Sequence, residues 1–181
     1  YKPGFIMINR HGVRFCNEAD SYHDVGIAMI ETCRDDNETF AWQICDRRAL
    51  RKYGMGFAKP APIPVALYLK NGYLVEGKTL AELAQKMGVP TATLAETVSH
   101  YNADARLGKD SQFGRGESAY NRYLGDASHQ PNPCVAPIEQ GPFYAVKLYM
   151  GELGTFHGLK TDGEARVLDN QGLPNPGLYA A

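Results

Sequence analysis

The alternation of apolar and polar residues predicts a set of short strands along this chain. Phe5–Ile8 is an apolar, β-prone run, and Val13–Asn17 alternates like a half-buried strand after the turn at Asn9–Gly12, so we expect a hairpin. Phe40–Cys45 is nearly all apolar, which indicates a central strand, and Phe143–Tyr149 forms another run. Asn-Gly and Asp-Gly turn signals predict two further hairpins, at Leu67–Val75 and at Leu159–Leu168.

A helical spacing of apolar residues predicts two adjacent helices near the middle of the chain. The first begins with a capping box, in which the Thr79 hydroxyl accepts from the Glu82 amide and the Glu82 carboxylate accepts from the Thr79 amide, and it stops at Gly88. The second opens at Pro90 and ends at Gly108. The expected buried faces are Leu80, Leu83, Ala84 and Met87, and then Leu94, Val98, Tyr101 and Ala105. Two shorter helices are expected, from Asp24 as the cap to Cys33, and from Arg47 to Tyr53.

The remaining segments are rich in turn-forming residues. Gly56–Pro64 is expected to be a surface excursion. Lys109–Pro137 is polar and irregular, and loops of this length are usually binding surfaces, lids or disordered. Helices interleaved with antiparallel hairpins indicate an α+β fold, with a small antiparallel or mixed sheet and packed helices, and not a doubly wound parallel sheet.

Composition excludes several classes of function. With 181 residues the chain is long enough for one compact domain, or a domain and a tail, and its formal charge of -1 without a basic stripe excludes nucleic-acid binding. No apolar run approaches the roughly 20 residues that span a bilayer, and the start lacks a signal-peptide layout, so we expect a cytoplasmic protein without a membrane span. Four cysteines without a C-x-x-C pair and five scattered histidines indicate reduced core thiols and no metal site.

Six segments carry a resemblance to a known family because they occur in one characteristic order. They are RHGVRFCNEADSY, TLAELAQKMGVPTATLAETVSHYNADARLGKDSQFGRG, YNRYLGD, PNPCVAPI, GPFYAVKLYMGELGT and TDGEARVLDNQGLPNPGLYAA. Together they resemble the FAD-dependent 3-ketosteroid dehydrogenases of the fumarate reductase flavoprotein superfamily. The resemblance implies that residues 1–154 are the substrate-covering capping domain, and that residues 155–181 start the return into the FAD-binding domain.

The same resemblance implies a piece of a larger flavoenzyme, because the family's GLYAAG motif continues past the last residue of this chain. FAD is therefore the expected cofactor of the full-length protein. The G-x-G-x-x-G fingerprint is absent, and Gly54-Met55-Gly56 does not qualify because it follows a helix, so the chain alone is expected to be inactive and free of FAD. Its expected partner is the missing FAD-binding domain. An excised cap would expose apolar surface, which predicts self-association.

Tyr22 matches the position of the proton acceptor in this family. The family reaction removes a proton to a base and a hydride to the flavin N5 from adjacent carbons beside the ketone of a steroid-like substrate. A phenol ordinarily has a pKa of about 10, so such a base needs a helper, expected from the missing part of the protein. The alternative is that Tyr22 is a surface tyrosine after a hairpin.

The resemblance also implies further contacts with the substrate and the cofactor. The substrate-binding candidates are Tyr144, Gly154 and Thr155, and the cofactor-binding candidates are Gly151, Gly158, Gly177, Leu178 and Tyr179. Glycine lets a backbone pass close to a flat ring, but an ordinary tight loop and a packed tyrosine are the alternatives. His157 stays open between a polar contact and an ordinary turn residue.

Two charged groups have structural and functional interpretations. Arg14 and Glu18 form an expected charged pair that sets the geometry of the first hairpin, in a region that feeds protons to the site of fumarate reductases. The basic helix Arg47–Arg51 is either a solvated face or a contact for an anionic substrate.

Two other functions stay open. A fumarate-reductase-like enzyme acting on a small carboxylate is one, but Leu153-Gly154-Thr155 stands where those enzymes have His-His-Thr. The other is a binding module without chemistry. The sequence does not indicate which steroid bond is oxidised.

Overall fold

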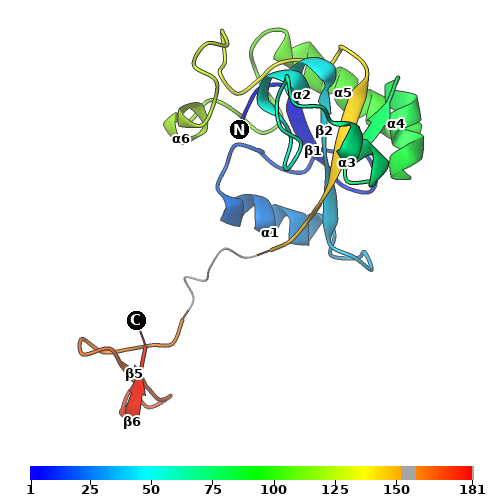
Figure 1. Cartoon of the computed structure of the whole chain (residues 1–181). Coiled ribbons are helices and arrows are strands. Elements are labelled where there is room, and N and C mark those ends of the chain that lie inside the picture. The colour runs from blue at the N-terminus through cyan, green and yellow to red at the C-terminus, as the bar shows by residue number, and fades with distance from the viewer. Residues whose placement is uncertain (152–157, 181) are drawn as a thin grey trace. The chain divides into compact units, whose positions relative to one another are not determined.

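The computed structural model describes residues 1–151 and 158–180, in two compact units, Tyr1–Met150 and Gly151–Ala181. The first unit is built on a four-stranded antiparallel sheet of order β1-β2-β4-β3 (Figure 1). Its strands are β1 (Phe5–Ile8), β2 (Phe40–Asp46), β3 (Val75–Gly77) and β4 (Phe143–Tyr149). The expected small antiparallel sheet with packed helices is confirmed, and β2 is an interior strand as its apolar run indicated.

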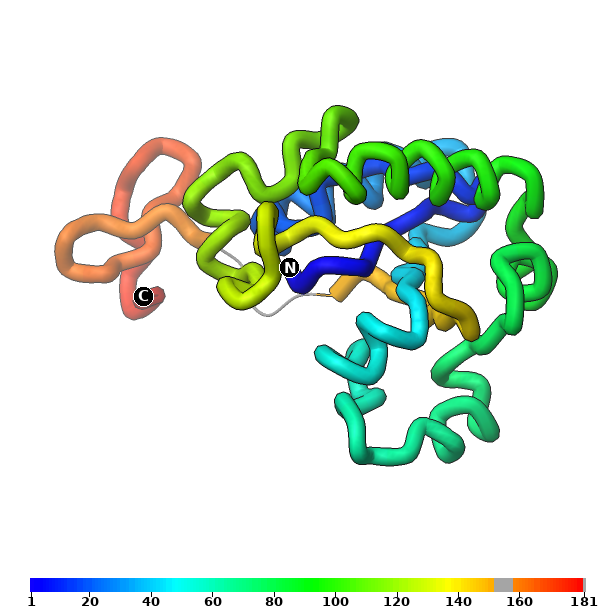
Figure 2. The backbone as a smooth tube through the Cα atoms, turned by 90° about the horizontal axis from the view of Figure 1, so that it is seen from above, coloured from blue at the N-terminus to red at the C-terminus, as the bar shows by residue number. Residues whose placement is uncertain are grey.

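One face of the sheet is covered by the two adjacent helices, α4 (Leu80–Met87) and α5 (Thr91–Ala105). Ile6, Ile44 and Ala145 alternate inward from three strands and form one core with the apolar faces of these helices. Leu83, Leu94 and Val98 are buried in it, as the helical spacing predicted. Figure 2 shows green α5 and cyan α2 on opposite sides of the strands.

The other face is covered by three further helices. At one end, α2 (Arg47–Tyr53) and α3 (Ala66–Lys70) enclose a second core that includes Phe5, Cys45 and Val146. At the other end, α1 (Tyr22–Thr32) packs Met29 and Cys33 beside Ala41 of β2. The four cysteines are free and buried, as expected. Both faces of the sheet are therefore filled by this unit's own helices.

The capping box of α4 is confirmed with one difference. The Thr79 hydroxyl accepts from the Glu82 amide at 3.1 Å, but the Glu82 carboxylate accepts from the Lys78 amide at 2.9 Å, and not from that of Thr79. Gly88 ends the helix in the left-handed region. The cap of α1 is Ser21 and not Asp24, so the helix begins three residues earlier than the sequence predicted.

Replacing Thr79 by alanine should lower the free energy of unfolding by about 1 kcal/mol, because the Glu82 amide loses its acceptor. Urea unfolding followed by far-UV circular dichroism measures the change. Thr93→Ala, inside α5, is the matched control and should not destabilise, because alanine has the higher helix propensity. Equal stability of the two variants would contradict a capping role.

Two of the expected hairpins are wrong. Val13–Asn17 makes only the bridge between Ile8 and Arg14, because the Arg14 side chain turns inward to acidic partners and the chain leaves the sheet. Leu67–Val75 instead contains α3, and β3 pairs with β4. The Asn71 side-chain oxygen accepts from the Tyr73 amide at 3.0 Å, so the Asn-Gly signal marks the end of α3.

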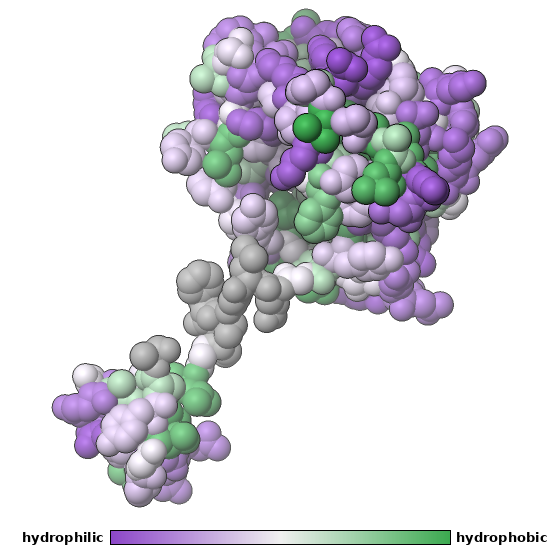
Figure 3. Space-filling model, viewed as in Figure 1, coloured by the Kyte–Doolittle hydropathy of each residue, from purple (hydrophilic) through white to green (hydrophobic). Residues whose placement is uncertain are grey.

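The long polar segment Lys109–Pro137 is largely built into the domain. It carries the short helix α6 (Ala119–Tyr123), and its buried side chains include Arg115 and Asn121, both 0% exposed. In contrast, the excursion before α3 lies on the surface, as expected. Figure 3 shows apolar side chains, in green, among polar ones on this face, and the exposed apolar residues here are Phe57 and Ile63 of the excursion and Leu67 of α3.

The second unit is a small two-stranded sheet of β5 (Arg166–Leu168) and β6 (Pro174–Tyr179). The expected hairpin around Asp162 is reduced to a bridge between Thr161 and Val167, because β5 takes β6 as its partner. None of the described helices has the length and apolar character needed to cross a membrane. Residues 1–151 and 158–180 hold no cluster of histidine, cysteine or acidic residues with metal-site geometry.

Candidate functional site

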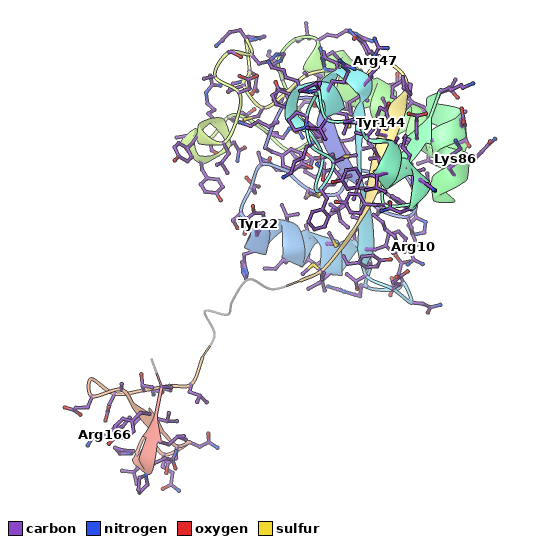
Figure 4. The ribbon with its side chains drawn as sticks, in the orientation of Figure 1. Arg10, Tyr22, Arg47, Lys86, Tyr144 and Arg166 are labelled. Atoms are coloured by element: carbon purple, nitrogen blue, oxygen red, sulfur yellow. The ribbon has the colours of Figure 1, made fainter. Side chains whose placement is uncertain are left out.

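The candidate base lies at the first position of a capped helix. Tyr22 follows Ser21, whose hydroxyl accepts from the Asp24 amide at 3.1 Å and donates to the Asp24 carboxylate at 2.6 Å. The Tyr22 side chain is 88% exposed, at the edge of the first unit (Figure 4). Because few contacts hold this side chain, the backbone that carries it determines where it leaves the domain.

The segment before Tyr22 is held by its own polar side chains. The Asn17 side-chain oxygen accepts from the Ala19 amide at 3.0 Å, and the Asp20 amide donates to the Asn17 carbonyl at 3.1 Å. The Asn17 side-chain nitrogen donates to the side-chain oxygen of Asn121 at 2.9 Å. We call Asn17–Ser21 the approach loop, and it connects the core of the domain to Tyr22.

A buried cluster of charges lies beneath the approach loop. Arg14 bonds Glu18 through two atoms, Nε to Oε1 at 3.0 Å and Nη2 to Oε2 at 2.8 Å, and it reaches both oxygens of Asp110 at 2.9 Å. Arg115 donates to Glu18 at 2.7 Å. The Arg14–Glu18 pair was expected from the sequence, whereas Asp110 and Arg115 were not. The four side chains are between 0% and 2% exposed, and their formal charges cancel.

The cluster is also bonded to the sheet and to α5. Glu18 accepts from the Met7 amide at 2.9 Å, and Arg115 donates to the Phe5 carbonyl at 2.7 Å, so the cluster holds two residues of β1. Arg115 also donates to the Tyr101 hydroxyl. The Arg14 guanidinium lies 4.9 Å from the centroid of the Tyr101 ring, a cation–π distance.

Opposite charges keep the buried carboxylates ionised. Burial by itself would raise the pKa of Glu18, but the charges of Arg115 and Arg14 hold that pKa below its usual value. Burial would also raise the pKa of Asp110, but the hydrogen bond with Arg14 and the charge of Arg14 hold that pKa below its usual value. The cluster is therefore a neutral set of permanent charges that holds the approach loop at Glu18 and joins it to the segments that carry Arg14, Asp110 and Arg115.

The structure does not bring Tyr144 close to Tyr22. Tyr144 lies in β4, is 6% exposed and packs in the core beneath α2, well away from the start of α1 (Figure 4). Burial raises the pKa of the Tyr144 hydroxyl, and a hydrogen bond with Glu76 of the neighbouring strand adds to the shift.

The candidate glycines of the second unit stand in open space. A side chain added at Gly151, Gly158 or Gly177 would meet nothing within 4 Å, and Gly177 has a φ of +76°. Leu178 and Tyr179, in β6, are 48% and 64% exposed. The candidates Gly154 and Thr155, and His157 beside them, lie outside the described residues.

The basic helix α2 is partly committed to structural contacts. Arg48 donates to the Pro137 carbonyl at 2.8 Å, and Lys52 pairs with Asp126 at 2.7 Å. Arg47 and Arg51 are exposed on the same helix. The interpretation of this helix as a solvated face is therefore favoured over a contact for an anionic substrate.

Comparison with known proteins decides the family. A family model described as an FAD binding domain matches residues 1–181. The chain belongs to this FAD binding domain family. FAD is therefore the cofactor of the full-length protein, and the resemblance to flavoprotein oxidoreductases is confirmed.

The curated relatives include several dehydrogenases. The chain is 49% identical to 4-oxocyclohex-2-ene-1-carboxylate 5-dehydrogenase of Sinomonas cyclohexanicum, with 98% of the chain and 30% of that protein covered. It is 38% identical to 3-oxosteroid 1-dehydrogenase of Mycolicibacterium smegmatis, with 99% and 32% covered. Fumarate reductase flavoproteins also match. The chain spans about a third of the length of the curated relatives it matches.

A solved structure shares the fold. The crystal structure of 3-ketosteroid delta1-dehydrogenase from Sterolibacterium denitrificans, in complex with 1,4-androstadiene-3,17-dione, superposes with a TM-score of 0.90 at 40% identity. The match covers 98% of this chain and 32% of that one. The mixed fold with small antiparallel sheets is thus the fold of one segment of a steroid dehydrogenase.

Proposed function

We propose that this chain is the substrate-covering cap of an FAD-dependent dehydrogenase that oxidises a 3-ketosteroid beside its ketone, with Tyr22 as the proton acceptor. In this proposal residues 1–154 form the cap and residues 155–181 begin the return into the FAD-binding domain. The observation that carries it is an exposed tyrosine on a rigidly held helix start, in a chain whose relatives include ring-ketone dehydrogenases.

Tyr22 has the chemistry that the reaction requires. Its oxygen, after giving its own proton to a helper outside this chain, takes the proton from the carbon beside the ketone, and the electron pair left behind forms the new double bond as a hydride departs from the next carbon. FAD, when bound, would supply the acceptor for that hydride. Hydrogen-bond donors on the ketone oxygen stabilise the developing negative charge, and we assign these donors to parts of the protein outside this chain.

The exposure of Tyr22 supports a site shared with another domain. At an open surface, water competes with Tyr22 for the proton of the substrate. The proposed dehydrogenation therefore needs a site from which water is excluded. The relatives are about three times as long as this chain, so the missing portion is large enough to cover Tyr22. The isolated chain is accordingly proposed to be inactive.

Of the FAD molecule, the described residues offer contacts for the isoalloxazine ring only. The open backbone at Gly151, Gly158 and Gly177 leaves room for the flat isoalloxazine ring, and Leu178 and Tyr179 offer exposed apolar surface beside it. The chain has no G-x-G-x-x-G turn to hold the pyrophosphate. We assign these five residues to the ring and Tyr144, Gly154 and Thr155 to the substrate side, where Tyr144 acts through packing.

A small ring ketone that carries a carboxylate is the second candidate substrate, because the relative at 49% identity is named for one. Both candidates undergo the same chemistry beside a ketone. A fumarate-reductase-like reaction on an open-chain dicarboxylate is less favoured. Its substrate has no ketone, whereas the relatives at 49% and 38% identity are named for ring ketones.

The full-length protein should reduce a dye acceptor with a ring ketone and not with succinate. A 3-ketosteroid and 4-oxocyclohexanecarboxylate, assayed side by side, separate the two candidate substrates. Fumarate with a reduced dye provides the third assay. Activity on succinate or fumarate, with neither ketone oxidised, would contradict the proposed reaction.

A further inference from the structure

We propose that Asn121 is a positioning residue that fixes the approach loop, and through it the direction of Tyr22. The inference rests on the proposed function, because it gives the loop a catalytic purpose. Asn121 lies in α6, within the polar segment Lys109–Pro137, and is 102 positions from Ala19.

Every hydrogen-bonding position of the Asn121 side chain is occupied. Its nitrogen donates to the Ala19 carbonyl at 3.0 Å and to the Asp20 carboxylate at 2.9 Å. Its oxygen accepts from the Asn17 side chain at 2.9 Å and from the Gly116 amide at 3.0 Å. An amide has two donors and two acceptor lone pairs, so this geometry satisfies all four.

Three of these four bonds go to the approach loop. They hold Asn17, Ala19 and Asp20, the residues that lead directly to the capped start of α1. The fourth bond goes to Gly116, the neighbour of Arg115 in the buried charge cluster. Asn121 therefore joins the loop that carries Tyr22 to the segment that carries Arg115 of the buried charge cluster.

The backbone of Asn121 is also held by hydrogen bonds within the domain. Its amide donates to the Ser118 hydroxyl at 3.1 Å, which caps α6, and its carbonyl accepts from the Cys134 thiol at 3.0 Å. A helix of five residues has little stability alone, so these contacts and the side chain define where α6 lies. The residue is 0% exposed, which excludes direct contact with a substrate in this conformation.

The test is Asn121→Asp in the full-length flavoenzyme. The variant keeps the size and the acceptor oxygen of the side chain, but places an oxygen against the Ala19 carbonyl and the Asp20 carboxylate. We expect kcat to fall about 10- to 100-fold with KM changed less than about twofold, since a small displacement of a reacting group has this effect. The flavin spectrum should be unchanged.

Asn102→Asp is the matched control. Asn102 is also a buried asparagine, 6% exposed, but both of its side-chain bonds go to the backbone of Ile138 and not to the approach loop. It should lower the melting temperature without selectively lowering kcat. Equal losses of kcat in the two variants at equal stability would overturn the inference.

A second variant and a second measurement keep the test decisive. Asp20→Ala removes one exposed partner of Asn121 without touching the core, and should give a smaller loss of kcat in the same direction. Hydrogen exchange should become faster at the amides of residues 17–22 in Asn121→Asp, and not in Asn102→Asp. Unchanged exchange there would overturn the positioning role, whatever the activity.

These readouts separate the inference from the proposed function. Faster exchange in the approach loop, together with full activity of a Tyr22→Phe enzyme, would refute Tyr22 as the base and leave Asn121 as the residue that fixes the loop. A strong loss of activity in Tyr22→Phe, with unaltered kcat and exchange in Asn121→Asp, would refute the positioning role alone.

Discussion

Replacing Tyr22 by phenylalanine in the full-length flavoenzyme should lower turnover about 10²- to 10⁴-fold, the range typical of a lost general base. The change removes one oxygen from a side chain that is 88% exposed, so the fold should be unaffected. The flavin absorbance spectrum should remain that of the unmodified enzyme, which shows that the cofactor is bound normally. Steady-state assays with a dye acceptor measure the loss.

Tyr123→Phe provides the control for this experiment. Tyr123 lies in α6 and is 86% exposed, so the substitution makes the same chemical change at an equally accessible tyrosine. It should leave turnover within about twofold, as expected for a surface change outside the reacting groups. Near-normal turnover in Tyr22→Phe would remove the central residue from the proposed mechanism.

Replacing Glu18 by glutamine should lower the free energy of unfolding by about 3–5 kcal/mol, because it leaves buried arginine charge without a partner. Glu18 is the carboxylate that Arg14 and Arg115 share. Urea unfolding can be followed by the fluorescence of the single tryptophan, Trp42, which packs against the main core. Glu38→Gln, which breaks an exposed pair with Lys147, is the control and should cost less than about 1 kcal/mol.

The same cluster predicts how stability depends on pH. The pKa values of Glu18 and Asp110 lie below their usual range in the folded chain, because the neighbouring arginines outweigh burial. Their contribution is therefore full above the unfolded pKa of about 4 and is lost as the pH falls through the lower folded values. Glu18→Gln should weaken this acid dependence, and an unchanged pH profile would contradict it.

The local elements were well predicted because their signals are local. The capping box, the left-handed Gly88 and the period of α5 lie within a few residues of the structure that they determine. The two wrong hairpins had equally good local signals. Their outcome depended on distant partners, since Arg14 turns to Asp110 and β3 pairs with β4.

The candidate site likewise has residues that the local sequence predicted and residues that it did not. Tyr22 and the Arg14–Glu18 pair were predicted from one contiguous motif, one of the six whose order indicated the family. Arg115 and Asn121 were missed, although the Gly-Arg-Gly stretch with positive φ at Gly114 and Gly116 is a signal for a tightly folded turn. Their importance comes from contacts across about a hundred residues of chain.

The sequence by itself determined that this chain resembles the FAD-dependent dehydrogenases of the fumarate reductase flavoprotein superfamily, that its helices and strands form an antiparallel α+β unit, and which tyrosine is the candidate base. These conclusions follow from motifs and from periodicities of short range. Only the tertiary structure decided how the candidate base is held, because burying two arginines requires carboxylates from distant segments to meet them. That requirement folds Lys109–Pro137 against the approach loop and fixes Tyr22 at an open edge.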